Sequence, residues 1–293
     1  MWFLFAFLNS WIGAFYYLCN QNSRLTTDVF IIYRGFIAAL IATPLMLFYH
    51  YTFPWEFYLV VLFQGFVISY MDRKYFEAFH KFGAENVNSI QPLTVIITFI
   101  LWLLIEPQIV LTYLSMPYRA TVIILSIMVI VFSVIKYRHH ATGLNCFKYV
   151  FPLLLLSSLT DMSNKIIMNY ADSHLIIASI HRVALTGWII GFVNLFNNRK
   201  KAGVNLSIFR PENLYKGSFI LLLVLSMVVL NLSMYYAPHP AYCVAVLYLS
   251  VVWIVLINKI QQWCGRQIVY QNVEKKWIFS LLIATIVLVL ATK

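Results

Sequence analysis

The segment Asp28-Val-Phe-Ile-Ile-Tyr-Arg34 has a counterpart later in the chain, Leu175-Ile-Ile-Ala-Ser-Ile-His-Arg182. Each segment is an apolar run that closes on an aromatic ring followed by arginine. The distance along the sequence from Arg34 to Arg182 is close to half of the 293-residue chain. A separation of this kind is expected when a structural unit has been duplicated. The pair therefore predicts that the chain consists of two similar halves.

Two further pairs of segments follow in the same order. Tyr75-Phe-Glu-Ala78 matches Met234-Tyr-Tyr-Ala237, and Leu93–Ile96 matches Leu249–Val252. In both pairs the separation along the sequence is similar to that of the two arginines. The order and spacing predict a first five-helix repeat over residues 1–140 and a second over residues 141–293. Both repeats are expected to form one membrane domain.

The composition indicates a membrane protein. The chain is 62% hydrophobic and 11% charged, with a mean hydropathy of +0.80, whereas soluble domains are about half apolar and about a quarter charged. This composition argues against a soluble enzyme, a nucleic-acid-binding module and a disordered chain. The apolar residues also form blocks long enough to cross a bilayer.

Charged residues, proline, glycine and asparagine divide the chain into ten apolar segments. The expected spans are Trp2–Cys19, Val29–Tyr49, Trp55–Tyr75, Ala84–Ile105, Tyr118–Ile135, Tyr149–Tyr170, Leu175–Phe196, Tyr215–Tyr236, Ala241–Ile257 and Trp277–Thr292. Backbone groups in lipid must be hydrogen-bonded within the segment, and the segments are too long and apolar for barrel strands. We therefore expect an all-α integral membrane protein with ten transmembrane helices.

An odd number of helices in each repeat inverts the second repeat relative to the first. Two inverted five-helix repeats are typical of secondary transporters, whose substrate site lies near the membrane midplane between the repeats. The loops are short, and none is long enough to form a catalytic domain. Whatever the chain binds, we expect it to bind inside the helix bundle.

Lysine and arginine predict the orientation in the membrane. Sixteen of the 21 lie in or beside the odd-numbered loops, and only Arg119 and Lys293 lie on the other side. Positive loops face the cytoplasm, so the count places both termini outside. The net charge of +11 is accordingly attributed to contacts with anionic lipid rather than to nucleic acid.

Several of these segments carry a family resemblance. The aromatic-arginine pairs of the second and seventh spans, together with Ala84-Glu-Asn-Val-Asn-Ser-Ile-Gln-Pro-Leu-Thr-Val95 and Leu103-Leu-Ile-Glu106, resemble the drug/metabolite transporter superfamily in its ten-helix, EamA-like branch. The resemblance implies a bacterial inner (plasma) membrane protein with cytoplasmic termini, opposite to the charge count. It also implies that the third, fourth, eighth and ninth helices face the substrate. The hydrogen-bonding residues of these helices that are candidates for substrate binding are Tyr75, Asn88, Gln91, Asn231, Tyr235 and Tyr248.

Ionisable residues at membrane depth are costly and therefore mark candidate sites. Asp161 and Lys165 lie four residues apart in the sixth span, so they share one helix face with Asn164 beside them. One interpretation is a cavity wall that contacts a charged or zwitterionic substrate. The other is an internal ion pair with no role in binding.

Polar groups of other spans extend this set. Arg34 and Arg182 either reach lipid headgroups or face a cavity as guanidinium groups that bind carboxylate or phosphate. In the first span, Asn9 and Trp11 offer an amide and an indole, for which helix packing is the alternative role.

The sequence predicts no catalytic residue, metal site or cofactor. The four cysteines are scattered, and no metalloprotease, serine-hydrolase or phosphate-binding-loop motif occurs. Without a nucleotide-binding domain, transport is expected to be driven by a gradient or by exchange. The expected partners are a small-molecule substrate, a coupling proton or ion, and membrane lipids, with a monomer or homodimer as the assembly.

The predicted function is therefore secondary active transport, as exporter, importer or exchanger, of a small polar metabolite that is amino-acid-like or charged. Two alternatives stay open. One is a drug or nucleotide-sugar carrier of the same fold, and the other is a membrane-embedded enzyme that acts on lipid head groups.

Overall fold

The computed structural model describes residues 1–293 except 24, 138–142, 172–173, 199–216, 265–274 and 293. The described residues form helices and contain no β-strand. The helices of the first half are α1 (Trp2–Ser23), α2 (Thr27–Phe48), α3 (Trp55–Phe82), α4 (Ala84–Ile90), α5 (Leu93–Ile105), α6 (Pro107–Ser115) and α7 (Pro117–Tyr137). Those of the second half are α8 (Leu144–Asn169), α9 (Leu175–Asn198), α11 (Ile220–Tyr236), α12 (Pro240–Leu247), α13 (Ser250–Trp263) and α14 (Lys275–Ala291).

The expected apolar segments are helical over most of their described length, and two of them are interrupted. The fourth segment divides into α4 and α5 at Gln91–Pro92, because Pro92 has no N–H to continue the helical ladder. The ninth divides into α12 and α13 at Tyr248–Leu249, where no proline is present. Both breaks are bridged by tighter backbone bonds, such as Thr94 N to Gln91 O and Val251 N to Tyr248 O.

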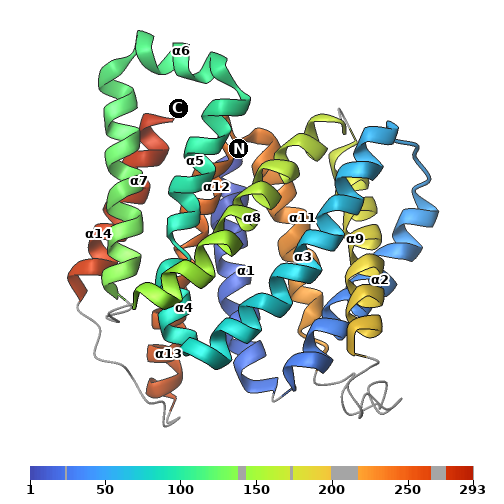
Figure 1. The fold of residues 1–293 in the computed structure, drawn as a ribbon. Helices are drawn as coiled ribbons and strands as arrows, with labels where there is room; N and C mark the ends of the chain where they lie inside the picture. The colour runs from blue at the N-terminus through green and yellow to red at the C-terminus, as the bar shows by residue number, and fades with distance from the viewer. Residues whose placement is uncertain (24, 138–142, 172–173, 199–216, 265–274, 293) are drawn as a thin grey trace.

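One helix lies outside the expected spans. The residues after Glu106 form α6, which begins at Pro107 and connects α5 to α7 across one end of the bundle (Figure 1). Proline at the first helical position is favourable because its missing N–H has no intrahelical partner there. The two termini lie toward this same end of the bundle.

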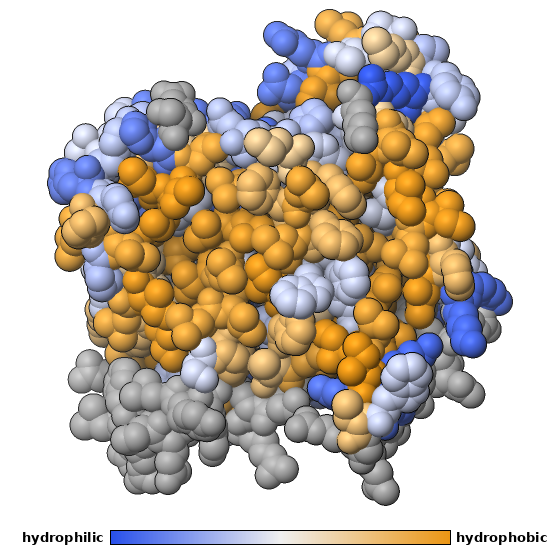
Figure 2. Space-filling view, turned by 180° about the vertical axis from the view of Figure 1, so that it is seen from behind, coloured by the Kyte–Doolittle hydropathy of each residue, from blue (hydrophilic) through white to orange (hydrophobic). Residues whose placement is uncertain are grey.

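Six helical stretches are long and apolar enough to cross a membrane. They are Trp2–Asn20, Thr27–Phe48, Asn86–Ile105, Pro117–Lys136, Leu175–Asn197 and Pro240–Trp263. Large apolar side chains cover the outside of the molecule, and Figure 2 shows them as a broad apolar surface across the middle of one face. A soluble protein rarely exposes an apolar area of this extent. The structure is therefore that of a helical protein with an apolar exterior, as a membrane protein requires.

The two halves meet along α2 and α9, which pack closely against each other. Around this contact, α1 packs on α11, α3 packs on both α8 and α9, and α7 packs on α14. The helix α11 packs on both α8 and α9. The helices α3, α8, α9 and α11 thus surround one region of the interior, where hydrogen bonds join Gln64, Asn164, Arg182 and Asn231.

Glycine allows the close approach of α2 and α9. A Cβ atom added at Gly187 would lie 2.8 Å from Ala39 N and 2.9 Å from Gly35 O, and one at Gly191 would lie 2.8 Å from the Phe36 ring. Small residues at a helix crossing are typical of membrane proteins, where close packing rather than hydrophobic expulsion drives helix association.

Candidate functional site

Arg182 of α9 is buried, with 3% of its surface exposed, and two amide oxygens hold its guanidinium. Its Nε donates to Oε1 of Gln64 on α3 at 2.7 Å, and its Nη1 donates to Oδ1 of Asn231 on α11 at 2.6 Å. Charge-assisted hydrogen bonds of this length are among the stronger ones in proteins. The cation is therefore fixed in position by neutral groups of two other helices.

Gln64 connects Arg182 to α8. Its Nε2 donates to Ser163 Oγ at 2.6 Å and to Asn164 Oδ1 at 2.7 Å. Gln64 is fully buried, and Ser163 and Asn164 are also buried. We call these five residues, Gln64, Ser163, Asn164, Arg182 and Asn231, the Arg182 network.

Arginine determines how the amides of this network are oriented. A guanidinium can only donate hydrogen bonds, so the atoms facing it on Gln64 and Asn231 must be the carbonyl oxygens. The amide nitrogen of Gln64 then points at Ser163 and Asn164, where it finds acceptors. The nitrogen of Asn231 points elsewhere.

Asn231 is 0% exposed, and its Nδ2 has no hydrogen-bond partner among the described residues. Leaving a buried donor unpaired costs about 1–3 kcal/mol. Arg182 Nη2 likewise donates to no described residue. Two donors beside one positive charge thus have unused hydrogen-bonding capacity.

Asp161 lies on α8, on the same helix face as Asn164, and is partly exposed. Its carboxylate accepts no hydrogen bond from the described residues, but it lies within electrostatic range of Arg182 without forming an ion pair with it. Tyr75 of α3 is within electrostatic range of the same carboxylate. The Asp161 carboxylate and the Arg182 guanidinium are therefore close enough to interact electrostatically but do not form a direct ion pair. Both groups keep free hydrogen-bonding positions.

Lys165 does not pair with Asp161. Its Nζ donates to the backbone oxygens of Tyr235 and Ala237, both at 2.7 Å. These carbonyls lie at the end of α11, where the helix leaves its last oxygens without intrahelical partners. The internal ion pair that the sequence allowed as an alternative is thus not formed, and Lys165 anchors the end of α11.

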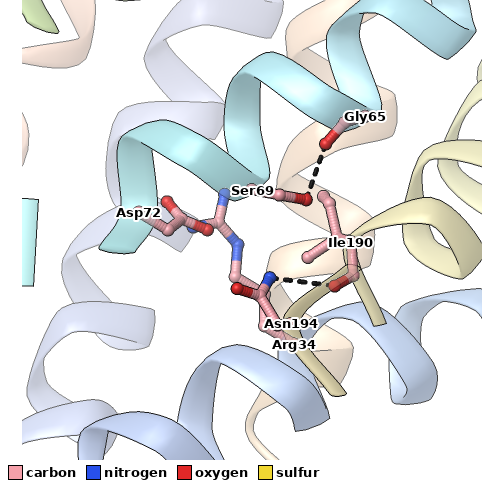
Figure 3. A network of polar contacts seen from close by, with 6 residues as sticks. All are labelled: Arg34, Gly65, Ser69, Asp72, Ile190 and Asn194. Atoms are coloured by element: carbon pink, nitrogen blue, oxygen red, sulfur yellow. Dashed lines mark hydrogen bonds and ion pairs between the residues drawn. The ribbon is translucent and has the colours of Figure 1, made fainter. Parts of the chain in front are cut away.

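A second polar cluster surrounds Arg34 of α2 (Figure 3). Its Nη1 lies 2.7 Å from both carboxylate oxygens of Asp72 on α3, and the two side chains are 20% and 13% exposed. Ser69 and Asn194 lie beside the pair, and each donates to a carbonyl of its own helix. Arg34 is therefore neutralised by a carboxylate of the chain itself.

Three more of the predicted residues lie outside the Arg182 network. Asn9 is buried between α1 and α11, where its Oδ1 accepts a hydrogen bond from Ser226 Oγ. Trp11 is 45% exposed and contacts the Phe15 ring, which places it on the outer surface of α1. Tyr235 contacts Lys165 through its ring as well as its backbone.

Three predicted residues lie at the helix interruptions. Asn88 and Gln91 occupy α4 and the break that follows it, and Tyr248 occupies the break after α12. All three are partly exposed. None of them lies on α3, α8, α9 or α11, the helices that carry the Arg182 network.

Gln64 and Asp72 are the partners that sequence reasoning did not assign. Gln64 is a single amide within the apolar run that precedes Gly65, and this isolated polar residue is the signal that points to it. Asp72 is not among the candidate residues that the sequence analysis names. The structure pairs Gln64 with Arg182, which is 118 residues away, and Asp72 with Arg34 of the preceding helix.

A cavity of about 160 Å³ lies between α2 and α3, away from the Arg182 network. Its lining includes Asp28, Arg73, Glu77 and His80. Glu77 accepts hydrogen bonds from Lys74 at 2.6 Å and from Tyr149 at 3.0 Å. This pocket belongs to the end of the bundle and shares no residue with the Arg182 network.

Within the described residues, no group of three or more histidine, cysteine, aspartate or glutamate side chains is placed to hold a metal ion. No protein-family model matches the chain, and no curated protein matches it. The features of the described residues that bear on function are therefore the Arg182 network, Asp161 and the helices around them.

Proposed function

We propose that this chain is a secondary transporter for a small, charged or zwitterionic metabolite, built from ten membrane helices in two inverted repeats, like the ten-helix branch of the drug/metabolite transporter superfamily. The substrate binds at the Arg182 network and Asp161. Transport proceeds by rocking of one half against the other around this site.

The positions of the helix breaks support the repeat. The sequence match of Leu93 with Leu249 fixes an offset between the two halves. The same offset carries the start of α4 at Ala84 onto the start of α12 at Pro240, and it carries the start of α5 to the position just before α13 begins. Two interrupted helices in corresponding places of two halves are a known mark of a transporter binding region.

The arginine contacts support the repeat independently. Arg34 corresponds to Arg182, and the offset that matches Tyr75 with Met234 also matches Asp72 with Asn231. Asp72 and Asn231 are the residues that the two arginines contact. Each half therefore contains an arginine that contacts the equivalent position of the following long helix.

The packing between the halves is asymmetric, as alternating access requires. The helices α5 and α12 pack together, and His239 and Phe99 stack there with ring centroids 4.6 Å apart. The corresponding pair, α13 and α4, is not among the closely packed pairs of the described helices. A carrier that is closed at one side of its site and loosely packed at the other has this arrangement.

The observation that carries the function is the Arg182 network with its unpaired donors. Burying an ionised group costs several kcal/mol unless it is paired. Here a buried arginine contacts neutral amides, while the carboxylate within electrostatic range of it, Asp161, stays unpaired and partly exposed. A purely structural arginine would gain more from a direct ion pair, whereas a binding site must keep its charges available.

Exchange transport in proteoliposomes tests this function. The purified chain is reconstituted, loaded with one unlabelled solute from a panel of amino acids, nucleotides, nucleotide sugars, polyamines and quaternary amines, and given the same labelled solute outside. We expect accumulation of at least one charged solute without ATP. Asp161→Asn should abolish it at unchanged reconstitution, while Glu56→Gln, a like change of acid to amide at the start of α3, should retain it. No exchange of any solute, or full exchange by Asp161→Asn, would overturn the proposal.

A further inference from the structure

The two equivalent arginines differ in the charge of the residue that Nη1 contacts. In the first half, Arg34 contacts the carboxylate of Asp72. In the second half, the corresponding position holds Asn231, so Arg182 contacts a neutral amide oxygen. The chain itself supplies a carboxylate at the first arginine and omits it at the second.

The donors around Arg182 define what is missing there. Arg182 Nη2 and Asn231 Nδ2 are both without partners among the described residues, and Asn231 Nδ2 is buried. Because Nη1 of the same guanidinium contacts Oδ1 of the same amide at 2.6 Å, the two free donors belong to adjoining groups. Two N–H donors beside one positive charge suit the two oxygens of a carboxylate.

Asp161 limits the ligand further. It lies within electrostatic range of Arg182, forms no ion pair with it and accepts no hydrogen bond from the described residues. Lys165, four residues after Asp161 on α8, instead donates to the carbonyls of Tyr235 and Ala237. An ammonium group of the ligand would supply the partner that Asp161 lacks.

We propose that the ligand of this site is a zwitterion of the amino-acid class. Its carboxylate binds Arg182 and Asn231, in the place that Asp72 occupies at Arg34, and its ammonium group binds Asp161. This inference rests on the proposed transport function, because it assigns the two ends of the substrate within the same site.

The first test compares ligands on the unaltered protein. Thermal unfolding is measured in detergent with each of the twenty amino acids, and every amino acid that raises the melting temperature is compared with its decarboxylated amine and its deaminated acid. A ligand that binds the folded state raises the melting temperature by mass action. We expect a shift for a zwitterion and at least a tenfold weaker apparent affinity for both truncated analogues. Equal binding of the amine or of the acid would overturn the proposal.

The second test moves the carboxylate into the protein. Asn231→Asp places an acid against Arg182 as Asp72 is placed against Arg34, so it should weaken zwitterion binding at least tenfold and raise the melting temperature of the free protein. Asp72→Asn, the reverse change at the equivalent position, should leave the affinity within about twofold. Unchanged binding by Asn231→Asp would contradict the assignment.

The two proposals fail in different ways. Exchange of a polyamine or a nucleotide sugar, with no binding of any amino acid, would overturn the proposal of a zwitterionic ligand but not the proposal of transport. If an amino acid binds and the variants change its affinity as expected, but no solute is exchanged in proteoliposomes, the zwitterion proposal would stand and the transport proposal would be overturned.

Discussion

Arg182 reaches the interior from α9 because α3 and α11 each present an amide oxygen to one of its N–H groups. Gln64 makes two of these interhelical contacts, because its oxygen accepts a hydrogen bond from Arg182 and its nitrogen donates one to Asn164 of α8. Neither bond joins residues near in sequence. A single side chain thus links α3, α8 and α9 in the interior of the bundle.

Replacing Gln64 tests that role. Gln64→Ala removes the acceptor of Arg182 Nε and leaves a buried charged donor unpaired, so we expect a loss of about 1–3 kcal/mol in stability. Gln108→Ala, on the exposed surface of α6, is the matched control and should leave stability unchanged. The measurement is thermal unfolding in detergent. Equal melting temperatures for both variants would show that Gln64 does not stabilise the protein through Arg182.

Lys165 is expected to act on structure rather than on binding. Lys165→Met removes two charge-assisted bonds to the end of α11, so stability should fall by about 1–3 kcal/mol, and amide hydrogen exchange should rise around Tyr235 to Ala237. Lys165→Arg should recover part of the loss. A variant with unchanged stability and no ligand binding would instead place Lys165 in contact with the ligand.

At this scale, candidate charged residues could be singled out from the sequence, whereas the residues that they contact could not. Asp161 and Arg182 were singled out because ionisable groups at membrane depth are costly, and Asn231 was singled out through the family resemblance. The contacts could not be predicted, since Gln64 and Arg182 are separated by 118 residues. The sequence offered Asp161 as the partner of Lys165, but the long lysine side chain reaches carbonyls that the end of α11 leaves free.

At the scale of elements, the crossing of α2 and α9 depends on the absence of side chains. Gly35, Gly187 and Gly191 bring the two backbones into direct contact, and both arginines project from the helices that cross here. The position of each arginine relative to α3 and α11 therefore follows from this crossing. The sequence predicted both helices, but not that they meet at glycine, because a close approach depends on how the halves are placed.

Alanine at this crossing should be costly. In Gly187→Ala the new Cβ would lie 2.8 Å from Ala39 N, which is backbone and cannot move aside, so we expect a destabilisation of about 1–3 kcal/mol. Gly13→Ala is the control, since nothing lies within 4 Å of a Cβ at that helical position. That change should be neutral or stabilise by up to about 1 kcal/mol. Comparable unfolding of the two variants would mean that α2 and α9 are not in close contact.

The interruption of the fourth helix was foreseeable from Pro92, whereas the break at Tyr248–Leu249 was not. Nothing in the residues there prevents a continuous helix, and the break becomes meaningful only through its correspondence with the first. The helix α6 was missed because its apolar residues are too few to span a bilayer. Local sequence thus predicts helices well, but it does not predict how they are divided.

At the scale of the whole molecule, Figure 2 shows one face that is apolar across its middle and more polar toward its ends. Polar residues such as Gln64, Arg182 and Asn231 are buried inside. The distribution of lysine and arginine predicts which end of the bundle faces the cytoplasm. By that count, the end that carries α6 and both termini lies outside.

Cysteine labelling tests this orientation. In a background without the four native cysteines, Gln108→Cys on α6 should react with a membrane-impermeant maleimide in intact cells. A cysteine placed between residues 199 and 216 should react only after permeabilisation. The opposite pattern would give cytoplasmic termini, as the family resemblance implies, and would show that the charge count misassigns the two sides.

The most direct test of the central claim is a structure determined with the amino acid that stabilises the protein most in the thermal screen. We predict ligand density within hydrogen-bonding distance of Arg182, Asn231 and Asp161, with the carboxylate toward the guanidinium. Density in the cavity between α2 and α3, or an Arg182 network unchanged and without ligand at saturating concentration, would contradict the account.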